Sequence, residues 1–193
     1  MNNVSIKRLK TNQPDFEKAL RQAVDWDDSV DEQVQASVRD ILQAVRREGD
    51  AAVLRYTEQF DRLQADSVAQ LEVAAERQQQ ALERIPEEQR QALHDAAERI
   101  RRYHEKQLPE SWEYQEASGT RLGQRVLPVD RAGVYVPGGK AAYPSSVLMN
   151  IIPARVAGVG EVIMVVPPSP DGELNDLVLA AAAIAGADRI FTL

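Results

Sequence analysis

Arg131 to Gly158 read RAGVYVPGGKAAYPSSVLMNIIPARVAG, and this stretch decides the fold. Residues 132–136 are apolar and β-prone, which predicts a strand. The prolines and glycines that follow predict a turn, and residues 143–157 then predict an apolar helix. This order puts a helix start at the carboxyl end of a strand, where open α/β sheets bind their ligands.

The residues after this stretch continue the alternation of strands and helices. Residues 161–166 are a run of Val, Ile and Met after one Glu. Such a run is too apolar for a half-exposed strand and predicts a parallel strand covered on both faces. A loop at 167–172 leads to a predicted helix at 174–185, which ends at Gly186, and residues 189–193 predict another strand. The β-α-β-α-β order predicts a parallel α/β sheet, and because it stops inside a strand we expect a truncated domain.

The residues before this stretch are mainly helical in pattern, since apolar side chains recur at intervals of three and four. Ser29 and Glu32 have the spacing of a capping box, and Gly49 is a plausible helix end. Pro86 suits the first turn of a long amphipathic helix that extends towards Gln107. The expected elements are helices near 16–24, 30–45 and 50–56, a short strand at 70–73, and helices at 74–85 and 86–107.

Between the helical region and the apolar tail, the composition changes to β-prone residues. Gly119, Gly123 and Pro128 punctuate the stretch 112–130. Two short β-prone runs separated by turn residues predict a β-hairpin.

Composition excludes several function classes. The formal net charge is −7 and no cluster of Lys and Arg opposes it, which argues against a nucleic-acid partner. The chain has no cysteine, so it has no disulfide, thiol nucleophile or cysteine metal site, and this composition is compatible with a reducing cytoplasm. No apolar run is long enough to span a bilayer and the N-terminus lacks an apolar signal core, so we expect no membrane partner.

The turn Tyr135-Val136-Pro137-Gly138-Gly139 is the strongest candidate for ligand binding. Its proline and glycines would let the backbone pass close to a flat or anionic ligand, and Tyr135 could stack on that ligand. The alternative is a tight strand-to-helix connection in which Tyr135 only packs, and spacing alone favours this alternative. The turn is neither a GxGxxG fingerprint nor a phosphate loop, so it does not by itself imply NAD.

The helix after the turn carries two further features. At least one hydroxyl of Ser145 and Ser146 is expected to cap its start, and the free amides there could also hold an anion. Pro153 lies inside the predicted helix and should bend or split it.

Catalytic and metal-binding side chains are not evident. His94 and His104 are ten positions apart on one predicted helix, about 15 Å along its axis, which is too far to share a metal. Asp61, Asp130 and Asp171 are isolated carboxylates in loop contexts and are expected to be cap or turn residues. We therefore predict no catalytic residue and no metal ligand in this chain.

Four motifs together resemble the histidinol dehydrogenase family, and the resemblance covers essentially the whole chain. The motifs are GDAAVLRYTEQFD at 49–61, YHEKQ at 103–107, GVYVPGG at 133–139 with YPSSVLM at 143–149, and PARVAG at 153–158.

The resemblance implies a cytoplasmic, homodimeric enzyme that uses NAD and zinc to oxidise L-histidinol to L-histidine through histidinal. It implies that Tyr135, Pro137 and Phe60 contact NAD. Members of the family are roughly twice as long as this chain, and their acid–base pair and zinc ligands lie in the part that this chain lacks, so we expect the fragment alone to be inactive.

The resemblance also implies a domain organisation. Residues 1–110 form a mainly helical N-terminal region, and residues 111–193 form the β-hairpin and the first half of a Rossmann-like α/β domain.

Two alternatives remain at this point. The Pro-Ala-x-x-Ala-Gly helix followed by a Val-rich strand is also similar to aldehyde-dehydrogenase-like enzymes, although those need a catalytic cysteine. A non-catalytic binding or assembly module with the same fold is the other alternative.

Overall fold

The computed structural model describes residues 8–24, 28–137, 142–168 and 174–193. The chain divides into two compact units, Met1–Ala52 and Val53–Leu193. The division between a helical region and an α/β domain at residues 110 and 111 stays a prediction.

The first unit contains two of the predicted helices, α1 (Phe16–Val24) and α2 (Asp28–Glu48). Gly49 ends α2 in the left-handed conformation with a φ of 59°, and its amide donates to the carbonyl of Val45 at 2.8 Å, as expected of a glycine helix end. The side chain of Ser29, half of the predicted capping box, lies outside the described residues. Helix α3 (Asp50–Asp61) begins in this unit and ends in the second.

The second unit continues with the short 3-10 helix η1 (Val68–Leu71), α4 (Ala75–Arg84) and α5 (Glu87–Glu105). Helices α4 and α5 confirm the two helices that the periodicity predicts at 74–85 and 86–107. The predicted strand at 70–73 is wrong: Glu72 forms a single antiparallel bridge with Phe191. The Val73 amide adds one bond, to the carbonyl of Ile190 at 2.8 Å. In the described chain the backbone pairing of this segment with β5 stops at this one bridge, so no ladder of bonds forms.

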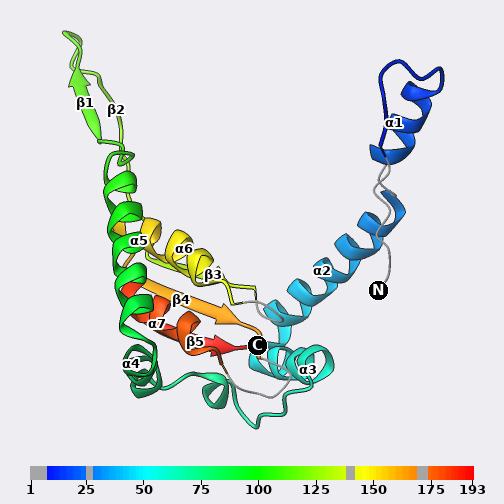
Figure 1. Ribbon diagram of the computed structural model, residues 1–193. Coiled ribbons are helices and arrows are strands. Elements are labelled where there is room, and N and C mark those ends of the chain that lie inside the picture. Colours follow the sequence, from blue (N-terminus) through cyan, green and yellow to red (C-terminus); the bar gives the residue numbers. More distant parts are fainter. Residues whose placement is uncertain (1–7, 25–27, 138–141, 169–173) are drawn as a thin grey trace. The chain divides into compact units, whose positions relative to one another are not determined.

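The β-α-β-α-β tail is confirmed as a parallel sheet (Figure 1). Its strands β3 (Arg131–Tyr135), β4 (Glu161–Val166) and β5 (Arg189–Thr192) lie in that order. Helix α6 (Pro144–Val156) connects β3 to β4, and α7 (Asp176–Ala185) connects β4 to β5. The molecule therefore has the predicted α/β class.

The core of the second unit lies on one face of this sheet. Val162, Met164 and Val166 are buried there, in one cluster with residues of α4, α5, α6 and α7. The alternate residues of β4, on the other face, are only half-buried. The prediction that residues 161–166 are covered on both faces is therefore wrong for the described part of the chain, because its helices pack on one face of the sheet.

The structure overturns the predicted serine cap of helix α6 and shows no split at Pro153, while a bend there stays a prediction. Tyr143 is the N-cap and makes no side-chain cap, so the expected serine cap is wrong. Ser145 and Ser146 lie within the first turn, where the amide of Ser146 donates to the Tyr143 carbonyl at 3.1 Å. The helix is also not split at Pro153, which lies in its last turn, where the missing proline amide removes one bond close to the helix end.

The predicted hairpin is confirmed as β1 (Trp112–Gln115) and β2 (Arg121–Gln124), which pair antiparallel. Gly119 has a φ of 91° in the connecting turn, a conformation that favours glycine. All eight strand residues are exposed, and the hairpin projects beyond the carboxyl end of α5 (Figure 1).

Within the described ranges, no helix combines the length and the apolarity that crossing a membrane requires.

Candidate functional site

The carboxyl end of β3 is the candidate ligand site. Tyr135 is the last residue of this strand and pairs with Val165 of β4. Its side chain is 61% exposed, whereas the next residue, Val136, is fully buried in the core. Because side chains alternate along a strand, Tyr135 projects from the face opposite the helices. Pro137 follows and is exposed, so the strand end presents two of the three predicted NAD contacts.

The surface beside Tyr135 is open. Gly133 lies two residues earlier on the same face, and a Cβ atom added there would meet no atom within 4 Å. Its neighbours across the strand pair, Ile163 and Val165, are half-buried and apolar. A glycine inside a strand often marks a close approach by a ligand or another backbone, and nothing in the described chain makes that approach. The face therefore offers a flat apolar floor next to an exposed aromatic ring.

The connection from β3 to α6 follows Tyr135 at this edge of the sheet, and the structure describes only part of it. Gly138 and Gly139 of the predicted turn lie outside the described residues. At the start of α6, the amides of Ser146 and Val147 already donate to the carbonyl of Tyr143, at 3.1 and 3.3 Å. An anion held by the helix start stays a prediction.

Phe60, the third predicted NAD contact, lies on α3 rather than on the sheet. Its ring is 59% exposed and stacks on Tyr56 one turn earlier, with centroids 5.7 Å apart and planes 3° apart. Among the described residues, no ring contact joins Phe60 to Tyr135.

The imidazoles and isolated carboxylates of the sequence do not gather at this edge. His94 is exposed and His104 half-buried on α5. Asp61 ends α3, and the carbonyl of Asp130 accepts the amide of Glu161 at 3.2 Å, while Asp171 lies outside the described residues. In the part of the chain that the structure describes, no three His, Cys, Asp or Glu side chains lie close enough together to hold a metal.

The carboxylates whose pKa values are shifted, Glu72 and Asp188, lie at the opposite, amino end of the sheet. Arg189 donates two hydrogen bonds to Glu72, at 2.8 and 2.7 Å, and these bonds lower the pKa of Glu72 and raise the pKa of Arg189. Burial raises the pKa of Asp188, but the amide of Val162 and the guanidinium of Arg155 together outweigh it, so that the net shift is downward. Although shifted pKa values often mark active sites, these bonds join structural elements, and none of them involves Tyr135.

Sequence reasoning missed the role of Arg155. Its guanidinium donates to the carbonyls of Gly186 at 2.8 Å and Val159 at 3.2 Å, and to the carboxylate of Asp188. Asp188 in turn accepts the amide of Val162 at 2.6 Å. These bonds join the loops that precede β4 and β5. No local signal predicts them, because Arg155 and Asp188 are 33 positions apart.

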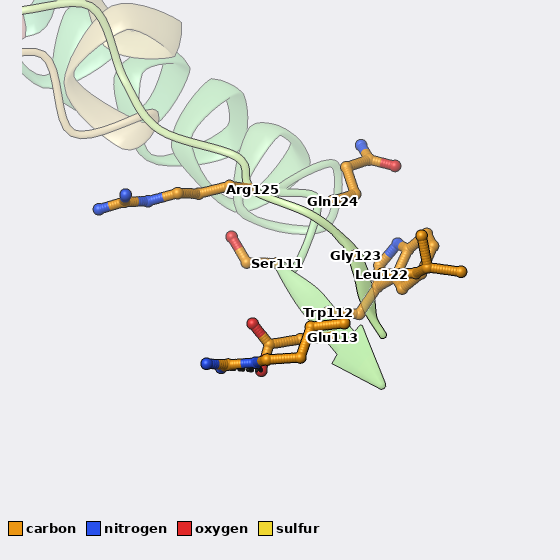
Figure 2. Close-up of a pocket in the computed structure, with 8 residues that line it drawn as sticks. Ser111, Trp112, Glu113, Leu122, Gly123, Gln124 and Arg125 are labelled. Carbon is orange, nitrogen blue, oxygen red and sulfur yellow. Dashed lines mark hydrogen bonds and ion pairs between the residues drawn. The ribbon is translucent and has the colours of Figure 1, made fainter. Parts of the chain in front are cut away.

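Sequence reasoning also missed an open cavity of about 440 Å³ on the hairpin. Figure 2 shows Trp112 and Leu122 on one side of the hairpin and Glu113 on the other. The cavity is formed by the hairpin and the residues that flank it, and the carboxyl edge of the β3-β4-β5 sheet contributes nothing to its lining.

Comparison with known proteins identifies a family. The family model described as histidinol dehydrogenase matches residues 25–193. The chain is 59% identical over 190 residues to histidinol dehydrogenase of Nitrosospira multiformis, covering 98% of this chain and 43% of the relative. It is 58% identical over 189 residues to the Pseudomonas aeruginosa enzyme of the same name, covering 98% and 43%.

A solved structure agrees with these relatives. The crystal structure of histidinol dehydrogenase from Elizabethkingia anophelis matches with a TM-score of 0.71 and 28% identity, over 82% of this chain and 36% of that one. The chain thus spans about 43% of the length of the two relatives compared by sequence. These matches favour the histidinol dehydrogenase resemblance over the aldehyde-dehydrogenase-like alternative.

Proposed function

The chain belongs to the histidinol dehydrogenase family, a family of oxidoreductases, and from this premise we propose that it contributes the NAD-binding side of an enzyme that oxidises L-histidinol to L-histidine through histidinal. NAD supplies the hydride acceptor of this chemistry when it is bound. The proposed partners are the small-molecule substrate L-histidinol and, in a full-length family member, a second copy of the enzyme. The proposed location is the cytoplasm.

The exposed ring of Tyr135 is the observation that carries this proposal. It stands at the carboxyl end of a parallel strand, where α/β sheets bind nucleotides, and beside it Gly133 leaves the sheet surface open. The flat apolar surface beside Gly133 suits a planar ring of the cofactor. The Tyr135 ring would stack on that cofactor ring, and Pro137 would lie at the border of the surface. Phe60, exposed on α3, is proposed as a further NAD contact.

The described residues do not fit a zinc ion. They bring no three potential ligands together, so no step of the reaction is assigned to zinc in this chain. We propose that zinc ligands and the acid–base pair belong to the part of the longer relatives that this chain does not span. For this chain, we propose two domains: a helical region at 1–110 and an α/β region at 111–193.

An NAD titration followed by calorimetry tests the cofactor site. Stacking of a base on an aromatic side chain contributes about 1–3 kcal/mol, so Tyr135→Ala should weaken NAD binding about tenfold or more. Tyr135→Phe keeps the ring and should bind NAD nearly as well as the unchanged chain.

Tyr103→Ala is the matched control. Tyr103 is 63% exposed, close to the exposure of Tyr135, but it lies on α5 away from the strand end. NAD affinity that is the same in Tyr135→Ala as in Tyr103→Ala would refute Tyr135 as a cofactor contact.

A further inference from the structure

The outer edge of β3 has no partner strand in the described chain. In the sheet order β3-β4-β5, β3 pairs with β4 on one side only (Figure 1). The amide of Val136, just after β3, donates to the carbonyl of Val165 at 2.9 Å, so its backbone groups point towards β4. Because this direction alternates along a strand, the residues of β3 that point their amides and carbonyls to the outer edge are Arg131, Gly133 and Tyr135.

The chain itself closes the opposite edge of the sheet. Glu72 forms an antiparallel bridge with Phe191 of β5, and the amide of Val73 donates to the carbonyl of Ile190 at 2.8 Å. Arg189 of β5 donates two hydrogen bonds to Glu72, at 2.8 and 2.7 Å. A further strand beside β5 would have to displace these contacts, so β3 is the edge at which this sheet can grow.

Strand β3 lacks the features that protect a free edge from pairing. Edge strands that stay unpaired usually carry prolines, lysines or bulges. The five residues of β3 are RAGVY, and they pair one to one with β4 along the whole strand, so β3 has no proline, no lysine and no bulge. Its single charge, on Arg131, forms an ion pair with Glu161 of β4. The outer edge of β3 is therefore suited to accept another strand.

The longer relatives contain a polypeptide segment that can supply this strand. The chain spans the N-terminal 43% of the relative from Nitrosospira multiformis, so the rest of that polypeptide follows the strand that corresponds to β5. We call this rest the C-terminal segment. A strand of the C-terminal segment that joins this sheet has only the β3 edge available to it. The strand order of doubly wound sheets likewise reverses beside the first strand.

A second copy of the chain fits the same edge less well. Two copies related by a two-fold axis would have to pair β3 with β3, and such a pair is antiparallel. The sheet of this chain is parallel throughout, and purely parallel sheets are over-represented among proteins. A parallel strand from the C-terminal segment keeps the sheet uniform.

We propose that this chain, as a separate polypeptide, binds the C-terminal segment of a histidinol dehydrogenase through a parallel strand added to the outer edge of β3. No peptide bond between the two pieces is required, because residues of the second unit already form one buried core behind the sheet. The added strand lies in the plane of the sheet, whereas the proposed NAD surface lies on its face, so both can be occupied together. The inference rests on the proposed function only in naming the partner.

Co-expression tests the association. The partner is the C-terminal segment of the Pseudomonas aeruginosa relative, and an affinity tag is placed on this chain. The unchanged chain should retain the C-terminal segment through purification as a one-to-one complex, recognised by the masses of both pieces. A C-terminal segment that stays insoluble or is lost during purification with the unchanged chain would overturn the proposal.

Gly133→Pro tests whether the contact is at the β3 edge. Proline removes the outward amide of residue 133 and puts its ring where the added strand would lie, and an edge strand tolerates proline where the amide faces outward. Retention of the C-terminal segment should fall at least tenfold. Gly133→Ala is the matched control, because it keeps the amide and its Cβ atom meets no atom within 4 Å. Equal retention by the two variants would overturn the edge contact.

Arg131 offers a second matched pair, which keeps the test decisive if Gly133→Pro does not fold. Arg131→Pro and Arg131→Ala both lose the ion pair with Glu161, but only the proline variant loses the outward amide. Circular dichroism of each variant alone checks that it is folded. The same tenfold difference in retention is expected between these two variants, and equal retention would again count against the edge.

Two further measurements separate the possible partners and the two proposals. In sedimentation velocity of the chain alone, a dimer that Gly133→Pro abolishes would show that a second copy occupies the edge and would overturn the choice of partner. With L-histidinol and NAD, the purified pair should produce NADH. Retention of the C-terminal segment without NADH refutes the proposed enzymatic function alone, whereas NAD binding that depends on Tyr135, without retention, refutes the association alone.

Discussion

Arg155 holds the amino end of the sheet through contacts that a shorter or uncharged side chain cannot make. It donates to the carbonyls of Gly186 and Val159 and to the carboxylate of Asp188. Replacing it in Arg155→Met leaves partly buried acceptors unpaired, so the free energy of unfolding in urea should fall by about 2 kcal/mol. Arg102→Met is the control: its ion pair with Glu98 is exposed on both sides, and its loss should change stability by less than about 0.5 kcal/mol. Equal losses in both variants would contradict the structural role of Arg155.

At the scale of the element, helix α7 depends on its cap. The side chain of Asn175 accepts the amide of Leu177 at 2.9 Å, which satisfies one of the free donors at the helix start. Asn175→Ala should therefore lower the free energy of unfolding by about 1 kcal/mol. Ser67 is the matched comparison, because it occupies the N-cap of η1 without a side-chain cap bond. Denaturation of Ser67→Ala should show almost no change, and a loss as large as that of Asn175→Ala would argue against the cap.

At the scale of the whole molecule, catalysis is expected to need more than this chain. The described residues offer no set of three metal ligands, Tyr135 has no acid or base partner there, and the relatives are more than twice as long. With L-histidinol and NAD, the 193-residue chain should produce no NADH above the buffer blank in an absorbance assay. The full-length relative from Pseudomonas aeruginosa serves as the positive control. NADH formation by the chain alone would show that this expectation is wrong.

Local patterns predicted the elements well because each element depends mostly on its own residues. The 3.6-residue periodicity of α5, the turn glycines of the hairpin and the apolar run of β4 are all visible within a dozen positions. Predictions that depend on neighbours failed. The segment 70–73 forms a single β-bridge with the sheet edge, and in the described part of the chain helices cover only one face of β4. Likewise, the N-cap of α6 is Tyr143 and not Ser145 or Ser146.

By itself, the sequence determined the order of the elements, the parallel α/β class and the resemblance to one family, because periodicity and short motifs carry this information locally. Only the tertiary structure decided that Tyr135 projects from the uncovered face, that Arg155 meets Asp188 and that the aromatic face of the hairpin stands free of its own unit. The physical reason is that burial and long-range hydrogen bonds depend on residues from distant parts of the chain. No local sequence pattern specifies which of these residues come into contact.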